Sequence, residues 1–92
     1  LIDDIHFAKA KVFIQKRQFS TALEELNEIV ENHKEGILVD NALFQMAEIY
    51  EEQLEDPEKA MGLYEQILME HMGSTFTVEA RKRFRRLRGD GV

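Results

Sequence analysis

Hydrophobic residues recur at helical spacing along nearly the whole chain of 92 residues. Ala22, Leu23, Leu26, Ile29 and Val30, for example, follow the i, i+1, i+4, i+7, i+8 pattern that places side chains on one face of a helix. The chain contains similar stripes before and after this one, and no alternating pattern of the kind that strands show. The pattern therefore predicts an all-α protein whose five helices are marked by residues 2–14, 22–30, 39–50, 60–68 and 76–87.

Capping residues agree with these boundaries. Asp56 stands before Pro57, and this order is typical of a helix start. The N-cap carboxylate can accept a hydrogen bond from a backbone amide of the first turn, and proline lacks an amide hydrogen that would need a partner at the first helical position. Thr21 and Glu24 have the spacing of a capping box. Glycines are expected at helix ends, where the left-handed conformation costs them little. They stand at positions 36, 73 and 89.

The chain also resembles itself. A shift of 38 residues places Ala22 on Ala60, whereas a shift of 37 residues places Ala10 on Ala47. The second shift is one residue shorter, so the second unit contains one extra residue between its two helices, and this residue is predicted to lie in the turn before Asp56. Two helix–turn–helix units followed by a lone helix describe this repeat, and stacking is expected because one helix pair cannot bury its apolar face alone.

The repeated residues resemble the tetratricopeptide repeat family. In that pattern a small residue precedes an aromatic one by three places in the first helix, as in Ala47 and Tyr50, and Ala60 and Tyr64 fit the second helix. The segment 56–65 looks very like the start of such a second helix. The resemblance implies an α-solenoid with a right-handed superhelix. It places one unit at 1–36, a second at 37–73, a C-terminal capping helix at 74–89 and a tail at 90–92.

Two departures from the family pattern bear on this prediction. Arg17 replaces the turn glycine, and Arg85 stands where a second small residue belongs. The last helix is therefore interpreted as a terminal cap. Residues 74–87 also resemble a segment of tetratricopeptide proteins of the bacterial cell envelope, which favours a periplasmic or envelope location over the cytoplasm. Because the first residue is leucine, we expect a C-terminal fragment of a longer protein.

Composition excludes several function classes. The chain has no cysteine, so disulfides, thiolate zinc sites and cysteine nucleophiles are excluded. No apolar run reaches the ~18 residues that a membrane span needs. His33 and His71 occupy equivalent places in the two units, too far apart to share a metal, and His6 has no partner at metal spacing. No catalytic residue, metal or cofactor is expected.

Charge is distributed unevenly. Six of the twelve basic residues lie in 81–88, whereas the preceding 80 residues are strongly acidic and the net charge is −6. An acidic body is a poor ligand for nucleic acid, so no nucleic-acid partner is expected. The basic helix could still bind an anionic surface or an acidic partner segment. Charge balance favours a third alternative, in which it faces Glu48, Glu51 and Glu52. Together with Glu55 these glutamates could suggest cation binding, but the spacing of a calcium-binding loop is missing, so a solvated helix face is the simpler interpretation.

The family resemblance implies a function as well as a fold. The first helices of the units would line a concave groove that binds a protein or peptide partner. Phe7 and Phe44 occupy equivalent groove positions and are either anchors for that partner or members of a small core. The candidate groove residues are Phe7, Lys11, Ile14, Asn41, Phe44, Gln45, Glu48, Glu52, Lys82, Arg83 and Arg86.

The prediction is thus a non-catalytic protein–protein interaction scaffold. Two alternatives are the structural cap of a longer solenoid and a regulatory module of an enzyme or nucleic-acid complex that acts through helix 81–88. Weak self-association is also expected, because Leu1, Ile2 and Ile5 would form an apolar end face that no preceding unit covers.

Overall fold

The computed structural model describes residues 2–32 and 38–89, with side chains from Ile5 onward in the first helix. These residues form helices and turns and contain no strand, which confirms the all-α prediction. A π-helical turn, η1, continues the third helix directly. The elements are α1 (Ile2–Gln15), α2 (Phe19–Asn32), α3 (Val39–Glu48), η1 (Ile49–Gln53), α4 (Pro57–Glu70) and α5 (Thr77–Arg88).

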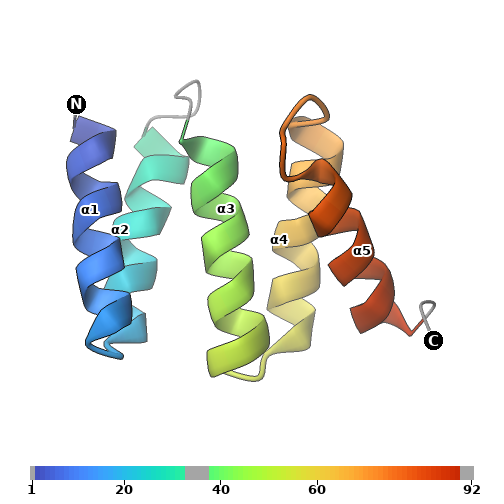
Figure 1. Cartoon of the computed structure of the whole chain (residues 1–92), viewed down its shortest axis with the longest axis horizontal. Helices are drawn as coiled ribbons and strands as arrows, with labels where there is room; N and C mark the ends of the chain where they lie inside the picture. Colours follow the sequence, from blue (N-terminus) through green and yellow to red (C-terminus); the bar gives the residue numbers. More distant parts are fainter. Residues whose placement is uncertain (1, 33–37, 90–92) are drawn as a thin grey trace.

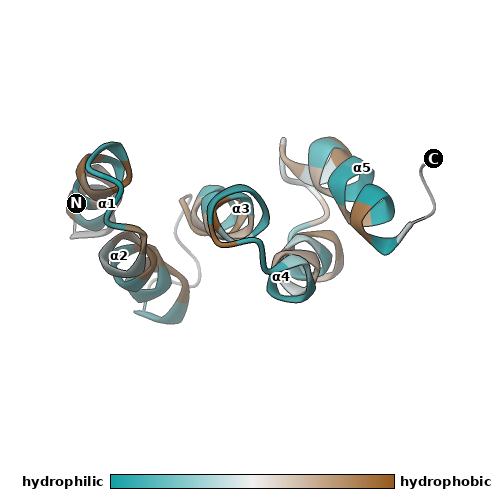
Figure 2. Ribbon diagram, turned by 90° about the horizontal axis from the view of Figure 1, so that it is seen from below, coloured by the Kyte–Doolittle hydropathy of each residue, from teal (hydrophilic) through white to brown (hydrophobic). Residues whose placement is uncertain are grey.

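The five helices pack consecutively, each mainly against its neighbours in sequence. They stand side by side in a row that follows the long axis of the molecule, with their own axes mostly across it (Figure 1). Seen along the helices, α1, α3 and α5 form one layer, and α2 and α4 form the other (Figure 2). The hydrophobic sides of the helices lie mostly between the layers. This arrangement is consistent with the paired helices that the sequence predicts.

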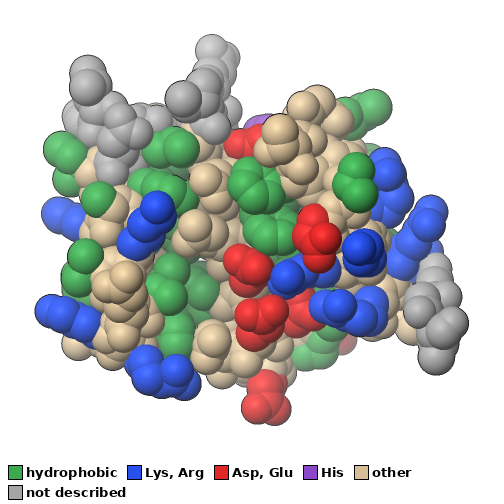
Figure 3. All heavy atoms as spheres, in the orientation of Figure 1, with side chains coloured by type: hydrophobic (Ala, Val, Ile, Leu, Met, Phe, Trp, Pro, Cys, Tyr) green, Lys and Arg blue, Asp and Glu red, His purple; other side chains and the backbone are tan. Residues whose placement is uncertain are grey.

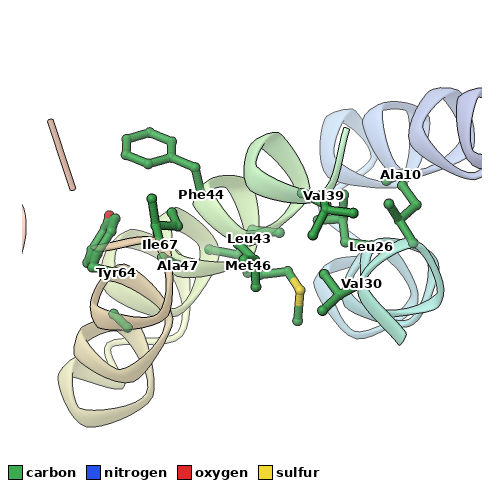
Figure 4. Packing of buried hydrophobic residues seen from close by; sticks show 14 of the residues in the cluster. Ala10, Leu26, Val30, Val39, Leu43, Phe44, Met46, Ala47, Tyr64 and Ile67 are labelled. Atoms are coloured by element: carbon green, nitrogen blue, oxygen red, sulfur yellow. The ribbon is translucent and has the colours of Figure 1, made fainter. Parts of the chain in front are cut away.

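The core follows the repeated stripe. Leu26 in α2 and Tyr64 in α4 occupy equivalent positions, and both are fully buried, as are Ile29 and Ile67 one turn further on. Small residues are also fully buried, which permits the close approach of neighbouring helices. These are Ala10, Ala22, Ala42, Ala47, Ala60 and Ala80. Figure 4 shows the larger side chains of α3 filling the space toward α2 on one side and α4 on the other.

Two predicted helix ends are confirmed. The carboxylate of Asp56 accepts a bond from the Lys59 amide at 3.3 Å, and Pro57 is the first residue of α4. Gly89 ends α5 with a φ of 97°, the left-handed conformation that glycine adopts without a steric penalty. Its amide donates to the carbonyls of the last turn and so satisfies two groups that the helix end leaves open.

Other predicted ends are wrong. Thr21 is not an N-cap, because α2 begins at Phe19 and the Gln18 carbonyl already accepts the Ala22 amide at 3.0 Å. Helix α4 ends at Glu70, three residues before the glycine at 73, and that glycine does not adopt a left-handed conformation. The glycine at 36 and the histidine at 33 lie outside the described residues.

The extra residue of the second unit lies in the π-helical turn. The amide of Gln18 donates to the Phe13 carbonyl at 2.8 Å, and the equivalent bond joins Asp56 to Tyr50, also at 2.8 Å. The first bond spans five residues and the second spans six. A π-helical turn accommodates one more residue per turn than an α-helix does. The insertion is therefore accommodated in η1, at the end of the helix, rather than in the turn before Asp56 where the sequence placed it.

Both units turn through a left-handed residue that is not glycine. Arg17 has a φ of 60° and Glu55 a φ of 52°, and the two positions are equivalent in the repeat. Such a conformation costs a residue with a Cβ roughly 1–2 kcal/mol. Arg17, which stands where the family pattern has glycine, therefore adopts the left-handed conformation of the turn at a higher energetic cost than glycine would.

Candidate functional site

The layer of α1, α3 and α5 presents one continuous face of the molecule (Figure 3). A hollow of about 260 Å³ lies on it, between α1 and the end of α3. Ile14 and Ile49 contribute apolar surface to the hollow. The polar lining comes from Gln45, Glu48, Glu52 and Gln53. Four of the candidate groove residues therefore line one concave site, namely Ile14, Gln45, Glu48 and Glu52.

Phe44 lies in the core. Its side chain is only 7% exposed, and its ring packs against Tyr64 in an edge-to-face contact at 5.6 Å and against Phe76 in a stacked contact at 5.0 Å between centroids. Of the two alternatives that the sequence leaves open for Phe44, burial favours the core. Phe7 differs, because it is half-buried on α1 and carries the Lys11 ammonium 5.0 Å above its ring.

Two further candidate residues lie outside the hollow. Asn41 is half-buried near the start of α3, where its amide donates to the side chain of Asp40 at 2.9 Å. Lys82 is exposed, and its ammonium lies 3.9 Å from Glu79, one turn earlier on α5. The structure does not bring either side chain to the hollow.

Arg83 joins α5 to the end of α3. Its Nη1 atom lies 3.3 Å from Glu48, 3.5 Å from Glu51 and 3.3 Å from Glu52, and its Nε donates to Glu79 at 3.1 Å. We call these five residues the Arg83 cluster. Its red and blue side chains meet on the right half of the face in Figure 3. The Arg83 side chain is 17% exposed, so its ion pairs are screened less than those on an open surface.

Tyr64 and Arg86 extend the Arg83 cluster. The Tyr64 hydroxyl donates to Glu51 at 2.8 Å and accepts from Arg83 at 3.2 Å. Arg86 donates to the second oxygen of Glu51 at 2.6 Å. The guanidinium of Arg83 also stacks 5.3 Å from the Phe44 ring centre, a distance typical of a cation–π contact. A fully buried tyrosine thus contributes its hydroxyl to the Arg83 cluster from the core side.

Burial and hydrogen bonding shift four pKa values in this region. Burial raises the pKa of Glu48, and the carboxylates of Glu52 and Glu51 add to this effect while Arg83 opposes it. Burial also raises the pKa of Tyr64. The hydrogen bond from Arg83 lowers the pKa of Glu79. Burial alone would lower the pKa of Arg83, but hydrogen bonds to Tyr64 and Glu79 outweigh it and the pKa is raised.

These contacts decide between the alternatives for the basic helix. Its prediction as the counter-charge to Glu48, Glu51 and Glu52 is confirmed for Arg83 and Arg86. The simpler interpretation of the glutamates as a solvated face is wrong for Glu51, whose side chain is 11% exposed. The sequence analysis missed Glu79, although its i, i+4 spacing to Arg83 signals an ion pair within one helix.

The described residues offer no other evident chemistry. No three histidine, aspartate or glutamate side chains among them converge on a point that could hold a metal ion. His6 instead pairs with Glu25 of α2, 2.6 Å from Nδ1 to the carboxylate. None of the described helices has the length and apolar character to cross a membrane.

Comparison with known proteins supports one part of the predicted repeat. Residues 41–71 match the family model described as tetratricopeptide repeat, and this segment runs from the first turn of α3 to the residue after α4. It covers about a third of the chain and includes η1. Searches of curated proteins and of solved structures found no match. The chain thus contains a tetratricopeptide repeat, which points to protein partners.

Proposed function

We propose that this chain is a non-catalytic interaction module that binds a segment of a partner protein on the face formed by α1, α3 and α5. The observation that carries the proposal is the hollow of about 260 Å³. It lies where two first helices of the repeat meet and combines the apolar side chains of Ile14 and Ile49 with two amides and two carboxylates. Concave sites with an apolar base and a few polar groups are typical of ligand binding.

The polar lining indicates the chemistry of the partner. Glu48 and Glu52 both line the hollow, and Arg83 is their shared counter-ion. The Arg83 cluster contains four carboxylates and one guanidinium, so it retains an acidic excess next to the hollow. A partner segment that places an apolar side chain between Ile14 and Ile49 and a basic group near Glu52 complements this surface.

The proposal also divides the chain into repeat units. Residues 1–36 and 37–73 act as two repeat units, and 74–89 close the second unit as a capping helix. The likeness of residues 74–87 to tetratricopeptide proteins of the bacterial cell envelope supports an envelope or periplasmic setting.

Selection from a random-peptide phage library tests the proposal. The chain should enrich peptides whose binding is weakened about tenfold or more by Gln45→Arg, because the longer side chain fills the hollow. Asn27→Arg is the matched control, since Asn27 is exposed on α2 in the opposite layer. Circular dichroism confirms that both variants are folded. Enriched peptides that bind the two variants equally well would contradict the proposal.

A further inference from the structure

Helix α5 has two faces of different chemistry. Ala80 is fully buried, and Phe84 and Leu87 pack against the core from the same side of the helix. On the other side, Val78, Arg81, Lys82 and Arg85 follow the i, i+3, i+4, i+7 spacing of a single helical stripe. We call these four residues the basic stripe.

The basic stripe lines a hollow on the outer side of α5. This hollow measures about 530 Å³, and its lining consists of the stripe and Arg86. Val78 is 68% exposed and the Lys82 side chain 69%. Arg86 is engaged with Glu51, whereas Arg81 and Arg85 make no ion pair with any described residue. Figure 3 shows the basic side chains of α5 gathered at the right-hand edge.

The repeat explains what this face is in the fold. A shift of 38 residues, which places Ala42 on Ala80, also places Leu43 on Arg81 and Ala47 on Arg85. In α3 both positions are fully buried, because helices lie on both sides of it. The same face of α5 has no described helix against it. Its arginines prevent the close approach that alanine allows, but they offer guanidinium groups to a helix that carries carboxylates.

The stripe also has a cost for the isolated helix. Arg81 and Arg85 stand at i, i+4 spacing, as do Lys82 and Arg86, and like charges at this spacing destabilise a helix. Glu79 offsets only part of this repulsion, because its carboxylate lies closer to Arg83, at 3.1 Å, than to Lys82, at 3.9 Å. Opposite charges from a second helix would remove the repulsion.

We propose that the basic stripe of α5 binds an acidic amphipathic helix of a partner protein. The partner helix lies along the face of α5 that corresponds to the covered face of α3, at a greater distance than α4 lies from α3, with an apolar side chain against Val78 and carboxylates facing Arg81, Lys82 and Arg85. This surface is separate from the hollow between α1 and α3, so a partner could occupy either site without the other.

Two other anionic partners fit the surface less well. An anionic membrane needs an apolar face to insert, but Phe84 and Leu87 are packed against the core and Val78 is the only exposed apolar side chain of the stripe. Nucleic acid fits less well because the carboxylates of the Arg83 cluster flank this stripe and repel phosphate groups.

The test is a second selection from the random-peptide phage library on the original chain, after which binding of the selected peptide to the double variant Arg81→Glu/Arg85→Glu is measured. The chain should enrich acidic sequences with apolar residues at helical spacing. The double variant should bind the selected peptide at least about tenfold more weakly, and moderate salt should weaken binding to the original chain. The variant Arg81→Lys/Arg85→Lys keeps the charge and should retain most of the binding.

Several controls decide the interpretation. Lys9→Glu reverses an exposed charge on α1 and should leave peptide binding unchanged. Gln45→Arg should also leave it unchanged, which separates this site from the proposed function. The proposal is overturned if no acidic sequence is enriched or if the double charge reversal leaves binding intact. It is equally overturned if a short DNA duplex or phosphatidylserine vesicles bind the chain and displace the selected peptide.

Discussion

The two helix pairs share a design but differ in their surroundings. Both turn through a left-handed residue, at Arg17 and at Glu55, and both close the turn with an equivalent backbone bond of 2.8 Å. Helix α3 is covered on both sides and buries six residues, whereas Ala10 is the one fully buried residue described in α1. The same sequence pattern therefore produces a core helix in one pair and a half-exposed helix in the other.

The equivalent aromatic residues of the two pairs differ in burial. Phe7 and Phe44 occupy the same repeat position, and the sequence alone could not assign either to the core or to the surface. Phe44 is buried because Tyr64 and Phe76 lie on either side of its ring. Among the described residues no aromatic ring packs against Phe7, which remains half-buried. Position in the stack, rather than residue type, decides between a core and a surface role.

The largest expected effect separates these two residues. Phe44→Ala should lower the free energy of unfolding by roughly 3–5 kcal/mol, the range for a truncated buried phenylalanine. Phe7→Ala should cost much less, because part of its ring already contacts water. Urea unfolding of both variants measures the difference. Equal losses would mean that the two pairs are packed alike.

Overpacking should affect the two pairs similarly, because Ala22 and Ala60 are both fully buried. Ala60→Leu should cost about 1–3 kcal/mol, since the added methylene groups force the neighbouring helices apart. Ala22→Leu should cost a comparable amount. Glu58→Ala, on the exposed first turn of α4, should change stability by only a few tenths of a kcal/mol and serves as the control. Thermal melts in which all three variants match would show that the helix faces are wrongly assigned.

Removal of the central arginine should affect only the second pair and α5. Arg83→Met should cost roughly 1–2 kcal/mol, because it leaves Glu48 and Glu51 close together without their shared counter-ion. Hydrogen exchange should accelerate in α5 and leave the α1–α2 pair unchanged. Acceleration throughout the chain would show instead that the helices unfold as a single unit.

Two carboxylates of the Arg83 cluster should respond to pH in opposite directions. The fold lowers the pKa of Glu79 from 4.5, so its charge contributes stability above pH 4.5 that is lost as the pH falls through the folded-state pKa. The fold raises the pKa of Glu48, so its charge opposes folding at neutral pH, and this opposition disappears as the pH falls through the raised pKa to below 4.5.

The matching glutamine variants test these signs. Glu79→Gln should lower Tm at pH 7, and Glu48→Gln should leave Tm unchanged or raise it. Both differences from the original chain should shrink in melts recorded below pH 4.5. A lower Tm for Glu48→Gln at pH 7 would show that its pairing with Arg83 outweighs its burial.

The smallest expected effect concerns the left-handed turns. Glu55→Gly should stabilise the chain by a few tenths of a kcal/mol, because relief of the conformational cost exceeds the added entropy of the unfolded chain. Arg17→Gly should gain less, since Arg17 also contacts the Phe19 ring and Gln53. Differential scanning calorimetry can rank the two variants. Destabilisation by Glu55→Gly would mean that the left-handed conformation is not strained here.

Much of the fold could be predicted from local pattern. The stripe through Leu26 and Ile29, the Asp56–Pro57 start and the Gly89 stop all depend on residues close in sequence, where spacing alone determines which side chains share a face. Thr21 was misjudged for a related reason. A threonine and a glutamate three residues apart fit the capping pattern whether they lie in the first turn of a helix or just before it. The apolar stripe does not resolve this, because it begins at Ala22, three residues after the start of α2.

The site could be predicted only in part. Charge balance correctly paired the basic helix 81–88 with the glutamates of α3 and η1, and the structure identifies Arg83 and Arg86 as the residues that make these contacts. The Tyr64 hydroxyl was missed, because the repeat pattern marks this position only as large and apolar. The hollow beside Gln45 required knowledge of how α1 and α3 approach each other, a relation between residues about thirty apart that no local pattern carries.

The π-helical turn also has a consequence for how such a gene can change. One added codon inside an α-helix rotates every later side chain by about 100°, which would turn the buried face of the helix toward water. Here the widened turn at 49–53 takes up the added residue just before the helix ends, and Asp56 still begins α4 in the register of the first unit. Repeats of this kind can therefore gain a residue, and with it a new side chain on the layer of α1, α3 and α5, without displacing the unit that follows.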